Sequence, residues 1–255
     1  IRLSLVGSEM CIRDRDMTFL IRDKYSGHTA VDLAADLARL EAGEPLAYVI
    51  GWVPFLNLKI WLASHPLIPR PETEWWTREC IQENKNAASL RVLDLCAGSG
   101  AIGLSLLEAL PMSQVSFAEL SPEHTEQIKE NILKNNLDAF RADIRASDLF
   151  ESFAEDRWNL IVCNPPYIPI DRKLESSVTD FEPREALFSG HDGMELIRRI
   201  VAELPRHLLP GGQVWMECDV SNIAETSALL TTAGCSVEIR NDQYGRARVV
   251  VGYFL

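Results

Sequence analysis

The sequence of 255 residues contains 25 Lys and Arg against 37 Asp and Glu, and 47% of its residues are hydrophobic. Such a composition can bury a core and excludes disordered and fibrous chains. The formal net charge of −12 gives no general attraction for a phosphate backbone, so we expect no direct sequence-specific nucleic-acid partner. No apolar run reaches the ~20 residues that span a bilayer, so we expect no membrane partner.

The cysteine and histidine patterns predict no metal site and no disulfide framework. The six cysteines are scattered without a CxxC pair, and the five histidines show no HExxH or other ligand spacing. We therefore expect free, buried thiols in a reducing compartment.

The N-terminal part of the chain predicts a helix and a hairpin. Residues 1–16 have no initiator Met, helical stripe or strand alternation, so we interpret them as a non-native or unstructured leader. The run at 29–40 has the apolar spacing of an amphipathic helix. Short β-rich runs at 46–50 and 56–62 predict a β-hairpin, and the three prolines within 66–71 predict a stiff extended connector.

From residue 91 onward, strand patterns alternate with helix patterns. This alternation predicts an α/β fold, in which a mostly parallel sheet carries helices on both faces. We expect helices at 101–110, 121–135, 194–208 and 221–231, and strands at 91–95, 114–120, 140–145, 158–163, 213–217, 236–240 and 246–254.

A glycine turn follows the first of these strands and reads Asp94-Leu95-Cys96-Ala97-Gly98-Ser99-Gly100. Its glycines let the backbone approach a ligand at a helix N-terminus. The spacing formally matches a dinucleotide-binding turn, but the carboxylate of Asp94 suits an ammonium or sulfonium group better than a pyrophosphate. Glu119 ends the next strand, where an acidic side chain can bind both ribose hydroxyls. Together these residues predict S-adenosyl-L-methionine as the cofactor, although a strand-end charge such as Glu119 can also be merely solvated.

The motif Asn164-Pro165-Pro166-Tyr167 directly follows an apolar strand, at the sheet edge where open α/β folds bind ligands. The Asn164 side-chain carbonyl and the Pro165 backbone carbonyl can hold the hydrogens of an NH2 group, so that the nitrogen lone pair points at a methyl donor. Tyr167 can lie against the flat acceptor. The motif therefore predicts methylation of a planar nitrogen; the alternative is a rigid turn without chemistry.

Residues 43–255 resemble the HemK/PrmC family of protein-(glutamine-N5) methyltransferases. The resemblance rests on the segments GEPLAYVIG (43–51), LIPRPETE (67–74), VLDLCAGSGAIGLSL (92–106), NPPYIP (164–169), FEPREALFSGHDGMELIRRI (181–200) and LLPGGQVWME (208–217). It implies a class I methyltransferase fold with a Rossmann-like, seven-stranded sheet. It also implies methyl transfer from S-adenosyl-L-methionine to the glutamine of the GGQ motif in peptide-chain release factors.

The resemblance also implies roles for particular residues. Residues 96–100, Glu119, Asp148, Leu149 and Asn164 would contact the cofactor, and residues 164–167 would bind the target glutamine. Arg70, Glu72 and Glu182 would form a wall of the cleft; a solvated charged surface is the alternative for them, as a plain core position is for Leu149. The sequence departs from the family where Cys96-Ala97 replaces the common Gly-Thr and where Glu119 replaces Asp.

We divide the rest of the chain by the same resemblance. Residues 17–43 are expected to be the remnant of an N-terminal helical substrate-binding domain, 44–68 the hairpin and linker, and 69–255 the methyltransferase domain. The family's helical bundle is larger, with ~50 or more residues, so release-factor docking is expected to be weakened here.

Two other function classes remain open at this stage. A nucleic-acid amino-methyltransferase acting on adenine N6 or guanine N2 would use the same NPPY geometry, but it should carry a basic groove. A nucleotide-binding or inactive scaffold would not need that motif. We expect a monomeric enzyme, cytoplasmic in a bacterium, with the mitochondrial matrix as the eukaryotic alternative.

Overall fold

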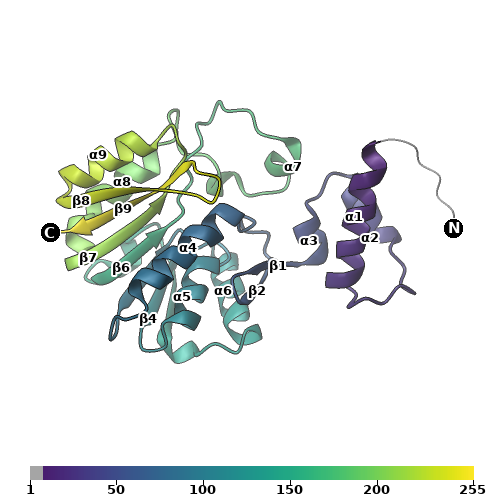
Figure 1. The fold of residues 1–255 in the computed structure, drawn as a ribbon, viewed down its shortest axis with the longest axis horizontal. Coiled ribbons are helices and arrows are strands. Elements are labelled where there is room, and N and C mark those ends of the chain that lie inside the picture. Colours follow the sequence, from purple (N-terminus) through teal and green to yellow (C-terminus); the bar gives the residue numbers. More distant parts are fainter. Residues whose placement is uncertain (1–7) are drawn as a thin grey trace.

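The computed structural model describes residues 8–255, and its centre is a seven-stranded sheet in the order β5-β4-β3-β6-β7-β9-β8 (Figure 1). β9 is antiparallel to both neighbours, and the other pairs are parallel. The predicted α/β fold is confirmed. The strands are β3 (Arg91–Leu95), β4 (Gln114–Glu119), β5 (Ala142–Ala146), β6 (Trp158–Cys163), β7 (Leu208–Glu217), β8 (Cys235–Asn241) and β9 (Ala247–Phe254).

Helices cover both faces of this sheet, as Figure 1 shows. One face packs against α4 (Pro71–Asn84), α5 (Ala101–Ala109) and α6 (Pro122–Lys134). The other face packs against α8 (Glu195–His207) and α9 (Ile223–Thr232). Shorter helical turns are η1 (Ala139–Arg141), η2 (Glu151–Phe153), α7 (Ser176–Thr179) and η3 (Arg184–Ala186).

The two cores explain why the central strands are apolar at nearly every position. Successive side chains of a strand point to opposite faces, so a strand covered on both faces has no polar side. Val92 belongs to the core under α4, α5 and α6, whereas Leu93 belongs to the core under α8 and α9. Leu160 and Ile161 alternate in the same way. The sheet is therefore buried on both sides, and its strand ends are left for a ligand.

The N-terminal elements lie to one side of the sheet in Figure 1, and the predicted hairpin differs from the one observed. Residues 46–50, expected as a strand, form the short helix α3 (Leu46–Ile50), because Pro45 begins one helical turn and Gly51 ends it with a φ of 92°. The hairpin consists instead of β1 (Trp52–Phe55) and β2 (Leu58–Trp61). Packing of Tyr48 and Val49 outweighs the strand preference of this run.

The helix α4 is absent from the sequence prediction, because its sequence is mostly polar and has only a weak apolar stripe. Pro71, expected to end the extended connector, is the first residue of this helix, a position that proline favours. The extended course of residues 66–70 agrees with the prediction.

Two further helices precede α3, namely α1 (Ser8–Asp23) and α2 (Ala34–Glu41). Residues 1–7 of the expected leader lie outside the described part of the chain. Residues 8–16 belong to α1, so the expected boundary after residue 16 falls inside a helix. Asp36 of α2 binds the segment that directly follows α1, because it accepts hydrogen bonds from Lys24 at 2.7 Å and from the Tyr25 hydroxyl at 2.6 Å.

Across residues 8–255, no helix is long and apolar enough to cross a membrane. The same residues contain no group of three or more His, Cys, Asp or Glu side chains that could bind a metal ion. Cys80, Cys163, Cys218 and Cys235 are buried free thiols, as predicted, whereas the free thiol of Cys96 is only partly buried.

The close packing of α5 on the sheet makes Gly103 a sensitive position. A Cβ atom there would lie 2.4 Å from the Phe117 ring and 2.8 Å from Asp94 Cβ. We expect Gly103→Ala to lower the free energy of unfolding by about 1 to 2 kcal/mol, because overpacking outweighs the ~1 kcal/mol gain in helix propensity. Urea unfolding measures the change, and Glu108→Ala on the exposed side of α5 is the control. A Gly103→Ala variant as stable as the wild type would contradict this packing.

Candidate functional site

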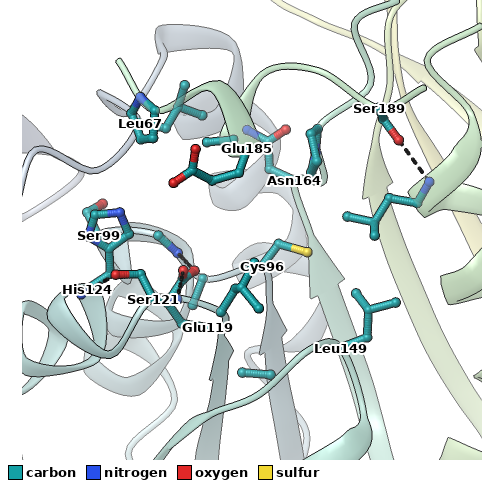
Figure 2. Close-up of a pocket in the computed structure, with 18 of the residues that line it drawn as sticks. Leu67, Cys96, Ser99, Glu119, Ser121, His124, Leu149, Asn164, Glu185 and Ser189 are labelled. Atoms are coloured by element: carbon teal, nitrogen blue, oxygen red, sulfur yellow. Dashed lines mark hydrogen bonds between the residues drawn. The ribbon is translucent and has the colours of Figure 1, made fainter. Parts of the chain in front are cut away.

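A cavity of about 470 Å³ opens at the carboxyl ends of β3, β4 and β6 (Figure 2). Chain order reverses between β3 and β6, and open α/β sheets bind ligands at such a point. The volume suits a small-molecule ligand. Predicted site residues that line it are Cys96, Ala97, Gly98, Ser99, Glu119, Asp148, Leu149, Asn164 and Pro166.

The glycine turn between β3 and α5 forms the floor of this cavity. Cys96, Gly98 and Gly100 all have positive φ values, of 59°, 55° and 79°. Gly100 is also tightly packed, since a Cβ there would lie 3.0 Å from Ile128 of α6. Cys96 adopts the left-handed conformation without being glycine, which costs about 1 kcal/mol or more. The turn is thus a constrained backbone segment at the start of α5, and the N–H groups of Ala97, Gly98 and Gly100 are held by hydrogen bonds within the protein.

Glu119 connects this turn to the next helix. It is 8% exposed, its Oε2 accepts from the Gly98 N–H at 2.7 Å, and its Oε1 accepts from the Ser121 N–H at 2.9 Å. Each carboxylate oxygen has a second lone pair, so both can still accept a hydroxyl hydrogen. Glu119 is therefore already oriented toward the cavity by the backbone, as the pair of ribose hydroxyls would require.

The hairpin supports the glycine turn through one buried asparagine. Asn131 of α6 accepts from the Trp61 N–H at 2.8 Å and donates to the Ser99 carbonyl at 3.0 Å. His124, two turns earlier on α6, lines the cavity and its Nδ1 lies 2.9 Å from Ser64 Oγ. The sequence prediction did not include His124 among the site residues.

Asp94 does not line the cavity, contrary to the expectation of direct ligand contact. It is fully buried beneath the glycine turn, where its Oδ2 accepts from the Gly103 N–H at 2.8 Å. Its Oδ1 is buried without a hydrogen-bond partner. Burial, and the charge of Glu119 nearby, raise the pKa of Asp94, whereas the Gly103 N–H lowers it. The position of β3 explains the difference, because a side chain inside a strand points into a face of the sheet and not beyond its end.

Asp148 and Leu149, which follow β5, form another wall of the cavity. Leu149 is 5% exposed and has a positive φ of 52°, and the Ser147 hydroxyl donates to its carbonyl at 2.8 Å. Asp148 pairs with Arg199 of α8 at 2.9 Å. An apolar side chain thus faces the cavity beside an ion pair, an arrangement that suits a flat base with polar edges.

The predicted acceptor corner, residues 164–167, follows β6. Asn164 and Pro166 line the cavity, and Asn164 Nδ2 donates to the Thr73 hydroxyl at 3.4 Å. Tyr167 lies in the wall behind it, where its hydroxyl donates to Glu217 Oε1 at 3.1 Å. Pro165 is buried as well. The structure thus places Asn164 at the cavity but turns the Tyr167 hydroxyl away from it, because a buried carboxylate requires donors.

Arg70, Glu72 and Glu182 do not line the cavity either. Arg70 pairs with Glu182 at 2.6 Å, and Glu182, which is 5% exposed, also accepts from the Ile68 N–H at 3.1 Å. Glu72 lies in the first turn of α4. The Arg70–Glu182 pair fastens the connector to the 181–188 segment, so it supports the cleft from behind. Neighbouring residues line it instead, namely Leu67, Pro69, Thr73, Pro183 and Glu185.

The sequence prediction also missed Thr73 and Glu217. Thr73 lines the cavity from α4, and Glu217 is buried at the end of β7. The pKa of Glu217 is raised, because the effect of burial exceeds the lowering by hydrogen bonds from Trp76, Thr73 and Tyr167 and by the charge of Arg248. An acidic residue at the end of an apolar strand is the signal that identified Glu119, and the same signal was present at Glu217.

Comparison with known proteins agrees with this geometry. Residues 78–180 match the family model described as the methyltransferase small domain. The crystal structure of a methyltransferase from Pyrococcus furiosus has the same fold, with a TM-score of 0.58 at 17% identity over 86% of this chain and 98% of that chain. The family model and the shared fold identify the fold of this chain as that of the methyltransferases, with the cavity at the switch point of the sheet.

The family follows from two curated relatives. The release factor glutamine methyltransferase of Deinococcus radiodurans is 36% identical over 84% of this chain and 76% of its own length. That of Bordetella pertussis is 38% identical over 85% of this chain and 80% of its own length. The chain belongs to the family of release factor glutamine methyltransferases, which confirms the resemblance found in the sequence motifs.

The buried Asp94 makes stability depend on pH. Since its pKa is raised in the folded state, folding takes up a proton, and the wild type loses unfolding free energy as the pH rises above the ordinary carboxyl range. Asp94→Asn removes this titration and still accepts from the Gly103 N–H. We expect the free energy of unfolding of Asp94→Asn, taken relative to that of the wild type, to increase as the pH rises from about 5 to about 8. Urea unfolding at both pH values measures this difference. An equal difference at both pH values would show that Asp94 does not titrate in this way.

Proposed function

We propose that this enzyme transfers a methyl group from S-adenosyl-L-methionine to the side-chain nitrogen N5 of the glutamine in the GGQ motif of a peptide-chain release factor. The observation that carries the proposal is Asn164 at the cavity, beside the glycine turn and Glu119. The names of the curated relatives point to the same substrate.

The residues of the cavity fit the cofactor. Both oxygens of Glu119 are positioned to accept the ribose hydroxyls, and Leu149 offers an apolar surface for the adenine. When bound, the cofactor supplies an electrophilic methyl group on a sulfonium. We propose Cys96, Ala97, Gly98, Ser99 and Gly100 as its backbone cradle.

The acceptor corner addresses the weak nucleophilicity of a carboxamide. The nitrogen lone pair of an amide is delocalised, so the NH2 group must be oriented before it can attack. The Asn164 Oδ1 and the Pro165 carbonyl can each accept one N–H hydrogen, which directs the nitrogen toward the cofactor side of the cavity. Pro165 and Pro166 stiffen the backbone at this point, so the two acceptors keep a fixed separation.

The charge and the family support a protein acceptor over a nucleic acid. A net charge of −12 disfavours a phosphate backbone. The helices α1 and α2 provide a separate surface for a protein partner beside the methyltransferase domain (Figure 1). We propose that these helices help to hold the release factor, in whichever compartment the two proteins share.

A methyl-transfer assay with radiolabelled S-adenosyl-L-methionine tests the proposal. A release factor, a DNA duplex and ribosomal RNA are offered in parallel to the same enzyme preparation. Label on the GGQ glutamine of the release factor is the expected result. Label on DNA or RNA alone would instead support the nucleic-acid amino-methyltransferase as the function.

Asn164→Ala removes one of the two acceptors for the NH2 group. We expect turnover to fall by about 10²- to 10³-fold, because a positioned hydrogen-bond acceptor is lost. Cofactor affinity, measured by calorimetry, should change much less. Asn159→Ala, near the opposite end of β6, is the matched control. Near-normal turnover in Asn164→Ala would refute the role of the corner.

A further inference from the structure

A buried carboxylate lies behind the acceptor corner, and the reaction as proposed does not use it. Glu217 is 1% exposed. Its Oε2 accepts from the Thr73 hydroxyl and from the Trp76 indole N–H, both at 2.7 Å. Its Oε1 accepts from the Tyr167 hydroxyl at 3.1 Å. Donors from α4 and from the acceptor corner therefore engage both oxygens.

This arrangement determines the direction of the next hydrogen bond. Thr73 gives its only hydroxyl proton to Glu217, so its oxygen can only accept from other groups. Asn164 Nδ2 donates to that oxygen at 3.4 Å. The NH2 end of the Asn164 carboxamide therefore faces Thr73, and its Oδ1 is left for the cavity that Asn164 lines.

We infer that Thr73 and Glu217 are positioning residues, which orient the carboxamide of Asn164 so that its oxygen, and not its NH2, faces the acceptor nitrogen. A carboxamide has nearly the same shape in both orientations, so its hydrogen-bond partners must select one. In the reversed orientation the NH2 of Asn164 would meet the NH2 of the substrate, and two donors cannot bond. The inference rests on the proposed function only in requiring an NH2 group on the acceptor.

The orientation does not depend on the charge of Glu217. Burial raises the pKa of this carboxyl, and Trp76, Thr73, Arg248 and Tyr167 lower it. If Glu217 takes up a proton, Oε1 can donate to the Tyr167 hydroxyl, which also accepts, while Oε2 still accepts from Thr73 and Trp76. The indole N–H can only donate, so it keeps Oε2 as an acceptor in both protonation states.

The test is a set of substitutions at Thr73. Thr73→Val keeps the shape of the side chain and removes the hydroxyl, so nothing selects the orientation of Asn164. We expect kcat to fall by about 10- to 100-fold, with the KM for the release factor and the cofactor Kd from calorimetry each within about threefold of the wild type. Thr73→Ser, which restores the hydroxyl, should recover most of the lost kcat.

Thr77→Val is the matched control for loss of a buried hydroxyl. Thr77 lies one turn further along α4, is fully buried, and donates to the Thr73 carbonyl at 2.7 Å. We expect it to leave kcat unchanged. If Thr73→Val fails to fold, as judged by its Tm, Thr73→Ala removes the same hydroxyl with less bulk. A folded hydroxyl-free variant with wild-type kcat would overturn the inference, as would an equal loss of kcat in Thr77→Val.

Glu217 is tested separately. Glu217→Leu frees the Thr73 proton to donate to Asn164 Oδ1, and kcat should fall as far as in Thr73→Val. Glu217→Gln, whose amide oxygen can still accept from Thr73 and Trp76, should recover most of this kcat. If Glu217→Gln loses as much kcat as Glu217→Leu while both variants are folded, the hydrogen-bond polarity is not what Glu217 controls.

Failure of the proposed function would give a different result. If the wild type methylates a nucleic-acid amino group and not a release factor, the proposed substrate is wrong. The same variants are then assayed on that substrate, because an exocyclic NH2 needs the same acceptor oxygen. With either substrate, the kcat of the Thr73 variants decides whether the inference is correct.

Discussion

The acceptor corner depends on one buried carboxylate. Glu217 accepts three hydrogen bonds, from Thr73, Trp76 and Tyr167, and so joins α4, β7 and the turn after β6. A buried carboxylate without such partners would cost several kcal/mol, so the three donors cannot leave it freely. The result is a fixed wall behind Asn164, and the proposed orientation of the acceptor depends on that wall.

Around the glycine turn, buried carboxylates also accept hydrogen bonds, but here the donors are backbone N–H groups. Glu119 accepts from the Gly98 and Ser121 N–H groups, and Asp94 accepts from the Gly103 N–H. In each case a buried carboxylate at or near a strand end holds the start of a helix or turn in place. Three acidic residues, on β3, β4 and β7, thus set the shape of one cavity in a protein whose net charge is also negative.

The sheet and the motifs at its strand ends could be predicted from the sequence alone. Strands buried on both faces, such as β6, have a nearly continuous apolar pattern, and Gly98 to Gly103 and Asn164 to Tyr167 are local motifs whose place follows from strand order. The helix α3 was not predicted, because its short run is rich in β-formers, and both the flanking Pro45 and Gly51 and the packing of Tyr48 and Val49 make it helical. The ion pair of Arg70 with Glu182 could not be predicted from the sequence either, since it joins residues 112 positions apart. Whether a charged side chain lines a cavity or supports it from behind depends on such long-range contacts.

We propose that the acceptor corner holds the carboxamide of the substrate on the side of the cavity where the cofactor binds. A crystal structure with S-adenosyl-L-homocysteine and a Gly-Gly-Gln peptide tests it most directly. We expect the glutamine nitrogen to lie within hydrogen-bond distance of Asn164 Oδ1 and the Pro165 carbonyl, on the side that faces the sulfur. A glutamine side chain bound elsewhere, or a sulfur pointing away from Asn164, would contradict it.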